Sequence, residues 1–198
     1  MDFAGTVEMS TFAIERIELC GGAVTVPVAD HHAVLSAAGP ILTTARVVDF
    51  RSEGISFAEV LVVLRAAGGH RFLAKVAACD FSADIALLCG IDSPLGPSWG
   101  EFRLETWPLE LSCRRLPKRS DAPVEMYSPR RGWLDAHARW SRLEGKWSLG
   151  ELGQGLAGSP VMHGRCWIGI VGSCGKRAQL CKPAAATISF EEDHDDCY

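Results

Sequence analysis

Hydrophobic residues recur along this chain in short runs that are separated by turn residues. Short runs bounded by Gly, Pro, Asn, Asp or Ser predict β-strands rather than helices. In the first half the runs are Ala23–Val28, Ala33–Ala37, Ile41–Val47, Phe57–Leu64, Arg71–Ala78 and Ile85–Gly90. In the second half they are Leu109–Arg114, Val124–Tyr127, Trp133–Arg142, Trp147–Leu149, Ser159–Met162, Cys166–Gly172 and Ala185–Phe190. Strands that recur about every 8–12 residues are typical of all-β sandwiches and barrels.

A segment rich in Pro, Gly and Ser, Asp92–Gly100, separates the two sets of strands. Such a segment is typical of a connector between two halves of one domain. We therefore expect an N-terminal half over 1–91, a linker over 92–105 and a C-terminal half over 106–190. The last residues, 191–198, are mostly acidic, and we expect a solvated tail there. Metal binding or docking by this tail is the alternative.

Composition narrows the class of protein. The chain has 198 residues, of which 47% are hydrophobic and 22% charged, and its net charge is -4. It has no sustained basic stripe, which argues against nucleic acid as a partner. It also lacks an apolar run of the roughly 18 or more residues that a membrane span needs, so we expect no membrane association. Acidic residues precede any basic residue at the N-terminus, unlike a secretory signal, and this predicts a cytoplasmic protein or a domain of a larger one.

Eight cysteines raise the questions of disulfides and of metal. Without a signal peptide, reduced thiols are the expectation. His163 and Cys166, with Cys174, Cys181 and Cys113, form the strongest candidate metal set. Their spacing lacks the paired C-x2-C signature of a structural zinc site. We therefore expect no metal and no cofactor, and zinc remains the alternative.

Three segments carry the candidate chemistry. They read Pro40-Ile41-Leu42-Thr43-Thr44-Ala45-Arg46-Val47-Val48, Asp84-Ile85-Ala86-Leu87-Leu88 and Gly155-Leu156-Ala157-Gly158-Ser159-Pro160-Val161. They resemble the I-L-T-x-A-H-V-V, D-[IL]-A-L-L and G-x-S-G-S-P-V landmarks of trypsin-like (chymotrypsin-fold, HtrA-like) serine peptidases. The segments 69–84 and 164–171 resemble the strands that precede the family aspartate and follow the family serine. The resemblance implies an all-β fold of two six-stranded antiparallel β-barrels around a shared cleft.

At the landmark positions, Arg46 stands where the family has histidine, and Ala157 stands where it has serine. Asp84 matches the family aspartate. Arginine stays protonated and accepts no proton at neutral pH, and a methyl group has no lone pair with which to attack. The resemblance therefore predicts a degenerate triad and no peptidase activity. We expect Arg46 to pair with Asp84, the alternative being an exposed Arg46.

The resemblance also implies where a bound peptide would lie. The family's oxyanion hole is built from backbone N–H groups, which here belong to Gly155 and Ala157 and do not need the missing hydroxyl. A collapsed loop is the alternative. Strand addition along Ile168–Gly172 would bind a peptide segment. The expected peptide-binding residues are Leu156, Gly158, Ile170, Val171 and Gly172.

Other hydroxyl and imidazole groups are weaker candidates in the sequence. Ser159 precedes a proline, which indicates a turn-forming role. His31 and His32 fall in an expected turn before the first landmark, where they make poor bases. His137 lies in a polar strand, which indicates a surface position.

Three functional hypotheses remain. The leading hypothesis is an inactive trypsin-like pseudopeptidase that binds a protein or peptide partner in a regulatory or scaffolding role, also as a subunit of a larger complex. The alternative is an active serine endopeptidase captured with an inactivated site. A structural subunit whose cleft is filled by its own side chains is the third hypothesis.

Overall fold

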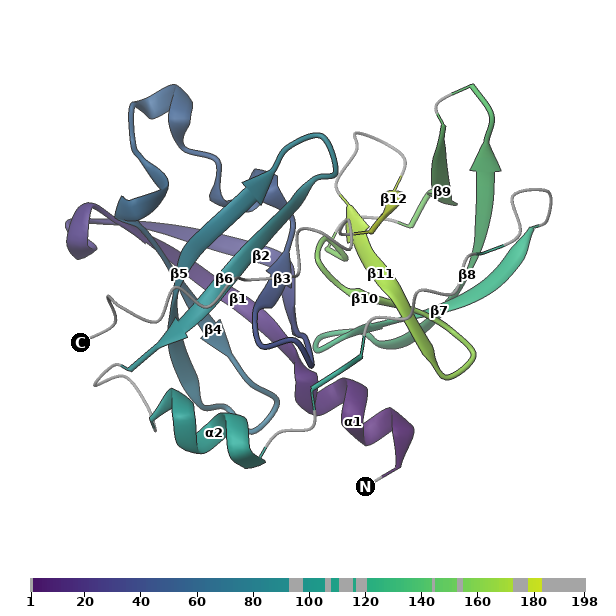
Figure 1. Ribbon diagram of the computed structural model, residues 1–198, viewed down its shortest axis with the longest axis horizontal. Helices are drawn as coiled ribbons and strands as arrows, with labels where there is room; N and C mark the ends of the chain where they lie inside the picture. The colour runs from purple at the N-terminus through teal and green to yellow at the C-terminus, as the bar shows by residue number, and fades with distance from the viewer. Residues whose placement is uncertain are drawn as a thin grey trace.

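The computed structural model describes residues 2–92, 98–105, 108–110, 116, 121–143, 145–152, 155–172 and 178–182. Two closed antiparallel β-barrels of six strands each lie side by side (Figure 1). The first barrel contains β1 (Thr11–Leu19), β2 (Val24–Leu35), β3 (Ile41–Thr43), β4 (Val60–Arg65), β5 (Arg71–Asp80) and β6 (Ile85–Ile91). The second contains β7 (Ala122–Ser128), β8 (Gly132–Ser141), β9 (Lys146–Gly150), β10 (Pro160–His163), β11 (Cys166–Gly172) and β12 (Ala178–Cys181). The predicted fold of two six-stranded barrels is confirmed.

Both barrels close through equivalent pairings. The strand order is β1-β2-β3-β6-β5-β4 in the first barrel and β10-β11-β12-β9-β8-β7 in the second. Apolar side chains from the strands of each barrel face inward, so each barrel has its own apolar core. A third apolar cluster contains residues from both barrels and from the N-terminal helix. Its buried members are Val7, Val34, Leu42, Ile85, Leu87, Leu109, Tyr127, Met162, Trp167, Ile170 and Cys181. This cluster packs the barrels against each other.

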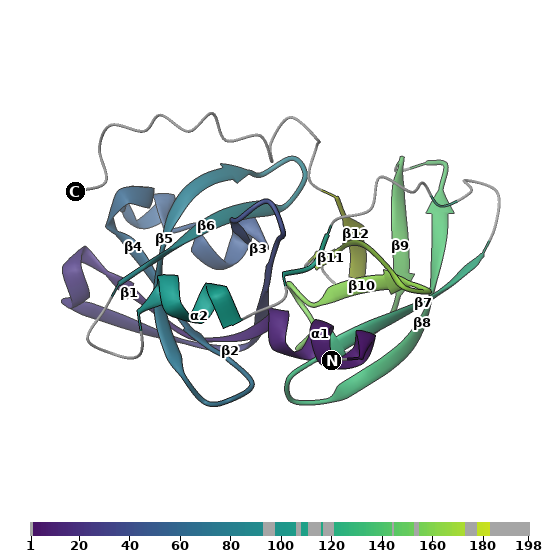
Figure 2. The same cartoon turned by 60° about the horizontal axis from the view of Figure 1, so that its bottom comes forward.

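Within the residues that the structure describes, two α-helices and four 3₁₀ turns accompany the strands. The helices are α1 (Phe3–Ser10) and α2 (Trp99–Glu105), and the 3₁₀ turns are η1 (Cys20–Gly22), η2 (Ala45–Val48), η3 (Arg51–Glu53) and η4 (Phe57–Glu59). Figures 1 and 2 place α1 at the junction of the barrels, and the Nε1–H group of Trp133 in β8 donates to the Glu8 carboxylate in α1 at 3.3 Å. The carboxylate of Asp2 caps α1 by accepting from the N–H group of Gly5 at 2.8 Å.

The helix α2 lies inside the segment expected to be a linker. Its aromatic side chains pack onto the first barrel core: the ring centroids of Phe102 and Phe72 are 4.3 Å apart, and those of Trp99 and Phe72 are 5.5 Å apart. Part of the connection is therefore a helix that is anchored on the first barrel.

Several expected strands differ in their bounds. The run Ile41–Val47 is a strand only to Thr43 and then turns into η2, which contains Arg46. The runs Ala23–Val28 and Ala33–Ala37 belong to one long strand, β2, which also includes His31 and His32. Of Leu109–Arg114 the structure describes Leu109 and Glu110, with Leu109 bridged to Ser36, and Ala185–Phe190 lies outside the described residues.

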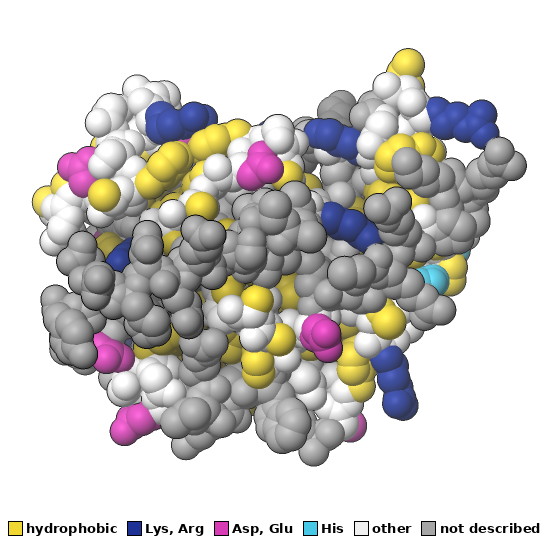
Figure 3. All heavy atoms as spheres, viewed as in Figure 1, with side chains coloured by type: hydrophobic (Ala, Val, Ile, Leu, Met, Phe, Trp, Pro, Cys, Tyr) yellow, Lys and Arg dark blue, Asp and Glu magenta, His cyan; other side chains and the backbone are white. Residues whose placement is uncertain are grey.

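On the face shown in Figure 3, the described Lys and Arg side chains lie apart from one another rather than in one patch. Among the residues that the structure describes, no helix has the length and hydropathy that a membrane crossing requires. The described cysteines, Cys20, Cys79, Cys89, Cys166 and Cys181, form no disulfide with one another.

Candidate active site

An imidazole from the first barrel lies between two hydroxyl groups from the second. Nδ1 of His32 is 3.1 Å from Oγ of Ser159, which immediately precedes β10. Nε2 of the same ring is 3.4 Å from Oγ of Ser128, the last residue of β7. His32 is 1% exposed and both serines are 0% exposed. The three side chains therefore form a buried Ser–His–Ser cluster across the barrel interface.

Burial decides the charge of this imidazole. Desolvation is the main cause that lowers the pKa of His32 to about 4; the neighbouring His31 contributes to the lowering, and Asp30 acts in the opposite direction. The ring is therefore neutral at pH 7. A neutral imidazole has one N–H donor and one nitrogen lone pair, so it can donate to one hydroxyl and accept from the other.

The backbone fixes His32 against the segment that carries Ser159. The His32 N–H group donates to the Ala157 carbonyl at 2.8 Å, and the Thr43 hydroxyl donates to the His32 carbonyl at 2.8 Å. Gly158 has φ of +81°, and a Cβ added there would lie 1.8 Å from the His32 carbonyl oxygen. Only glycine permits this approach, so Gly158 sets the distance between β2 and Ser159.

An irregularity in β2 shapes the entrance beside His32. The pairing with β1 shifts from His31↔Ile14 to Pro27↔Arg16, which leaves extra residues on β2. Asp30, in this bulge, has φ of +62°. Its carboxylate accepts from Nη1 of Arg130 at 2.7 Å, and this ion pair links the two barrels. A cavity of about 130 Å³ opens here, and His32 forms part of its wall.

The landmark residues Arg46, Asp84 and Ala157 occupy different positions relative to this cluster. Arg46 is exposed in η2, and its backbone N–H group donates to the Asp84 carboxylate at 3.3 Å. Asp84 immediately precedes β6 with φ of +53°. Ala157 bridges to His31 in β2. The structure thus brings Arg46 next to Asp84, whereas Ala157 borders the His32 segment. Their role as a degenerate triad stays a prediction.

The expected oxyanion and peptide-binding residues are held by contacts within the chain. Gly155 has φ of +92° and packs against Asp30, and Leu156 is buried. The Gly158 N–H group donates to the Val171 carbonyl at 2.7 Å, and the Val171 N–H group donates to the Ser159 carbonyl at 2.9 Å. On the other side of β11, Ile170, Val171 and Gly172 pair with β12. Peptide binding by these residues stays a prediction.

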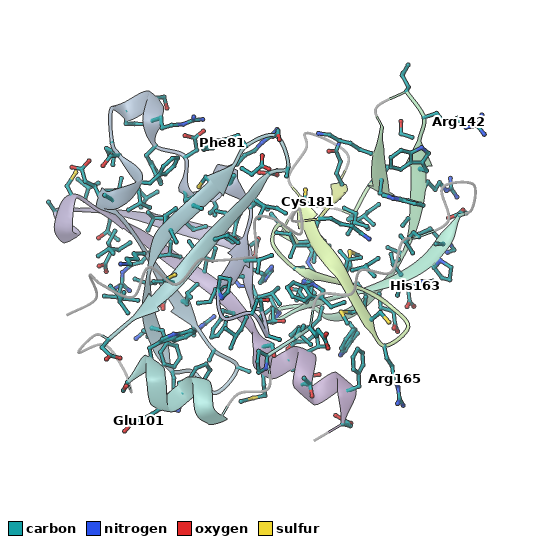
Figure 4. All side chains as sticks on the ribbon, viewed as in Figure 1. Phe81, Glu101, Arg142, His163, Arg165 and Cys181 are labelled. Carbon is teal, nitrogen blue, oxygen red and sulfur yellow. The ribbon has the colours of Figure 1, made fainter. Side chains whose placement is uncertain are left out.

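The candidate metal set does not converge within the described residues. Figure 4 shows His163 and Cys181 at well-separated places on the second barrel. The His163 ring nitrogen Nδ1 is 2.8 Å from the Pro123 carbonyl oxygen. No group of three or more His, Cys, Asp or Glu side chains arranged for a metal occurs in the described part of the chain. Cys113 and Cys174 lie outside that part.

Comparison with solved structures identifies the fold that the two barrels form. The Rv3671c protease of M. tuberculosis in its inactive form matches over 94% of this chain and 88% of its own, with 17% identity and a TM-score of 0.54. A serine-to-alanine mutant of the same protein, also an inactive form, matches over 94% and 86%, with 18% identity and a TM-score of 0.56. A serine protease of a human pathogenic astrovirus matches over 91% and 93%, with 17% identity and a TM-score of 0.57. This chain has the trypsin-like protease fold.

At these identities the likeness establishes the fold alone. No protein-family profile matches the sequence, and neither does any curated protein. The chain is therefore similar in structure to chymotrypsin-fold serine proteases, and its chemistry depends on its own residues.

The structure overturns the prediction of an inactive, non-enzymatic pseudopeptidase. That prediction assumed that Arg46 and Ala157 leave the fold without an imidazole facing a hydroxyl. His32 and Ser159 supply such a pair at 3.1 Å, on the fold of serine proteases. The turn expected at His31 and His32 was also wrong, because both residues lie in β2.

A sequence signal for His32 did exist. Side chains two apart on a strand share a face, so His32 lies on the same face as Val34. Val34 belongs to the apolar cluster between the barrels. Extending the alternation of Ala33–Ala37 back by one residue would have directed His32 toward that interface. Nothing local indicates that Ser128 and Ser159 meet it there.

Proposed function

We propose that this protein is a serine peptidase that hydrolyses peptide bonds of protein or peptide substrates. Ser159 is the nucleophile, His32 is the general base and Ser128 orients the imidazole. The observation that most directly supports this function is the 3.1 Å separation of the Ser159 hydroxyl and Nδ1 of His32. This distance is within the range required for proton transfer.

The hydrogen bonds favour one assignment of roles over the other. Oγ of Ser128 accepts from the backbone N–H group of Arg130 at 3.3 Å and lies 3.4 Å from Nε2 of His32. If Ser128 also accepts the Nε2 proton, the lone pair of the neutral ring is on Nδ1 and faces Ser159. The shorter contact is then the one that activates a hydroxyl, and the longer contact fixes the tautomer.

The reaction follows from this assignment. The Ser159 oxygen forms a bond to the substrate carbonyl carbon while its proton moves to Nδ1 of His32. The imidazolium then gives that proton to the leaving amine as the C–N bond breaks, which leaves an acyl group on Ser159. Water attacks the acyl carbon, its proton passes through His32 back to Ser159, and the carboxylic acid is released.

Access is the main physical requirement. Ser159 and Ser128 are 0% exposed, so the described conformation is closed. Substrate reaches the hydroxyl only when the residues that cover Ser159 are displaced while His32 and Ser159 stay paired. The bonds from His32 to Ala157 and from Gly158 to Val171 hold this pair together and must stay closed. Activity therefore depends on a more open conformation than the one described here.

A fluorophosphonate probe tests the proposal directly, because it phosphonylates an activated serine oxygen. The purified chain is incubated with the probe and, separately, with casein, and the labelled residue is mapped by mass spectrometry. We expect label on Ser159 and cleavage of casein. Ser159→Ala and His32→Gln should each lower the cleavage rate by about 1,000-fold or more.

Two variants serve as matched controls. Ser36→Ala removes a hydroxyl that is 2% exposed but lies outside the cluster, and it should retain label and activity. Asp84→Asn tests the family aspartate and should retain activity within about threefold, because the proposed pair does not use Asp84. A folded wild-type chain that takes no label and cuts no casein would overturn the proposal, and so would label on any other serine.

A further inference from the structure

The cavity beside His32 is lined by apolar residues and by charged residues of both signs. Ala13 and Ile14 of β1 supply the apolar part, and His31 and His32 border it on β2. The charged lining residues are Glu15, Asp30, Arg65 and Arg130. Its volume of about 130 Å³ is enough for a short side chain, since a cavity needs only about 10–15 Å³ of such volume to hold one water molecule.

Two carboxylates and two guanidinium groups line the cavity, and Arg71 adds a further guanidinium beside Glu15. The Asp30 carboxylate is neutralised by Arg130 at 2.7 Å, and the Glu15 carboxylate by Arg71 at 2.7 Å. The hydrogen bond to Arg71 is also the main cause that lowers the pKa of Glu15. This carboxylate is therefore ionised and already bound to Arg71. Arg65 forms no ion pair within 4.0 Å with any carboxylate of the described residues, although its charge also lowers the pKa of Glu15. One guanidinium is therefore available to an anion that enters the cavity.

We propose that this cavity is a subsite for an acidic side chain, Asp or Glu, close to the scissile peptide bond. This inference rests on the proposed peptidase function, because it makes the wall that contains His32 part of the substrate site. Arg65 binds the incoming carboxylate, in the bidentate manner that guanidinium permits. Ala13 and Ile14 contact the methylene groups of the bound side chain.

Matched peptides test the preference. A set of internally quenched peptides is made in pairs that carry Glu or Gln at one position around a fixed cleavage site. We expect kcat/KM to be about tenfold higher for Glu at one position and for the advantage to shrink as salt is raised. Arg65→Gln should reduce the advantage of the Glu peptide over the Gln peptide to about twofold or less.

Arg142→Gln is the matched control. It makes the same change of charge at an arginine that points away from the body of the protein at the tip of the β8–β9 hairpin (Figure 4). This variant should keep the full preference for Glu. Cleavage without a preference for Glu, or a preference that survives Arg65→Gln, would overturn the subsite while leaving the peptidase proposal intact.

A binding measurement separates the two proposals. Ser159→Ala is titrated with N-acetylglutamate amide and with N-acetylglutamine amide, and the backbone amide signals of Ile14 and His31 are followed by NMR. We expect saturable shifts with the glutamate compound only, and none after Arg65→Gln. Binding without any cleavage by the wild-type chain would retain the acidic site and overturn the peptidase. Absence of shifts would overturn the acidic site.

Discussion

Nδ1 of His32 and Oγ of Ser159 are 3.1 Å apart although 127 residues separate them in the chain. The imidazole comes from β2 of the first barrel, and the hydroxyl comes from the start of β10 in the second. The pair therefore exists only when the barrels are docked. Both side chains are fully or almost fully buried, so the pair links the proposed chemistry to the stability of the barrel interface.

The pH dependence of activity should follow the protonation of the His32 imidazole. Because desolvation lowers the pKa of His32 to about 4, the base is neutral and able to accept a proton at all pH values well above 4. We expect kcat/KM for a peptide without titrating groups to be half-maximal near pH 4 and flat from about pH 5 to 8. An unperturbed histidine would give a midpoint near 6.5.

His31→Gln tests the cause of this shift. The His31 charge lowers the pKa of His32, so its removal should move the midpoint of the profile upward. Circular dichroism at each pH shows whether the chain is still folded. A wild-type midpoint near 6.5 in a folded chain would mean that burial does not lower the pKa of His32.

The same imidazole should make folding stability depend on pH. The pKa of His32 is about 4 in the folded state against an ordinary value near 6.5, so the unfolded chain binds the proton more readily. This contribution is fully present above pH 6.5 and is lost progressively as pH falls to about 4. It amounts to about 3 kcal/mol of unfolding free energy.

Urea unfolding at pH 7 and at pH 4.5 measures this contribution. His32→Gln removes the titrating group, so its unfolding free energy should fall less than that of the wild type between these two pH values. His70→Gln makes the same substitution at an exposed histidine and should behave as the wild type. Equal pH dependence in all three chains would show that His32 is not buried in its neutral form.

The hydrophobic pattern of the sequence predicted the two barrels better than it predicted the individual strands. The strand Cys166–Gly172 was expected with the bounds that β11 has, because its apolar run ends at glycine. The strand β1 was missed because a bulge interrupts its alternation: Ile14 and Ile17 are both buried although they are three residues apart. Bulges arise from pairing with other strands, which a local pattern does not record.

The site was harder to predict than the fold. The family motifs directed attention to Arg46 and Ala157, since the expected chemistry depends on those two positions. The Ser–His–Ser cluster instead depends on how two barrels dock and on a glycine that lets their backbones approach. Ser159 was read as a turn residue because its neighbour is proline. Its contact with His32 joins residues that are 127 positions apart in the sequence, so a local sequence pattern does not predict it.

Gly158 should be far more sensitive to substitution than other glycines with positive φ. In Gly158→Ala the new Cβ would meet the His32 carbonyl oxygen at 1.8 Å, so the backbone of β2 or of the segment 155–159 must shift. We expect a loss of unfolding free energy of about 3 kcal/mol or more and loss of the His32–Ser159 contact. Thermal unfolding and labelling by the fluorophosphonate measure the two effects.

Gly164→Ala is the control for backbone strain. Gly164 also has positive φ, +59°, but a Cβ added there meets nothing within 4 Å. It should cost only about 1 kcal/mol, which is the usual cost of placing alanine in the left-handed region. Similar losses at both glycines would mean that close packing against His32 does not constrain Gly158.

Apolar packing, rather than the ion pair between the barrels, should hold the barrels together. Leu42 belongs to the apolar cluster between the barrels and is 0% exposed, so Leu42→Ala should cost about 2–5 kcal/mol. The side chains of Arg130 and Asp30 are 54% and 40% exposed, so solvent screens their attraction. Arg130→Ala should therefore cost less than about 1 kcal/mol.

Urea unfolding of both variants at low and high salt decides between these contributions. The Leu42→Ala loss should be unaffected by salt, and the small Arg130→Ala loss should shrink further as salt rises. Because the Ser159 hydroxyl meets His32 only across this interface, Leu42→Ala should also lower the rate of fluorophosphonate labelling in the folded chain. If Arg130→Ala destabilised the protein more than Leu42→Ala, charge pairing would be the dominant contact between the barrels.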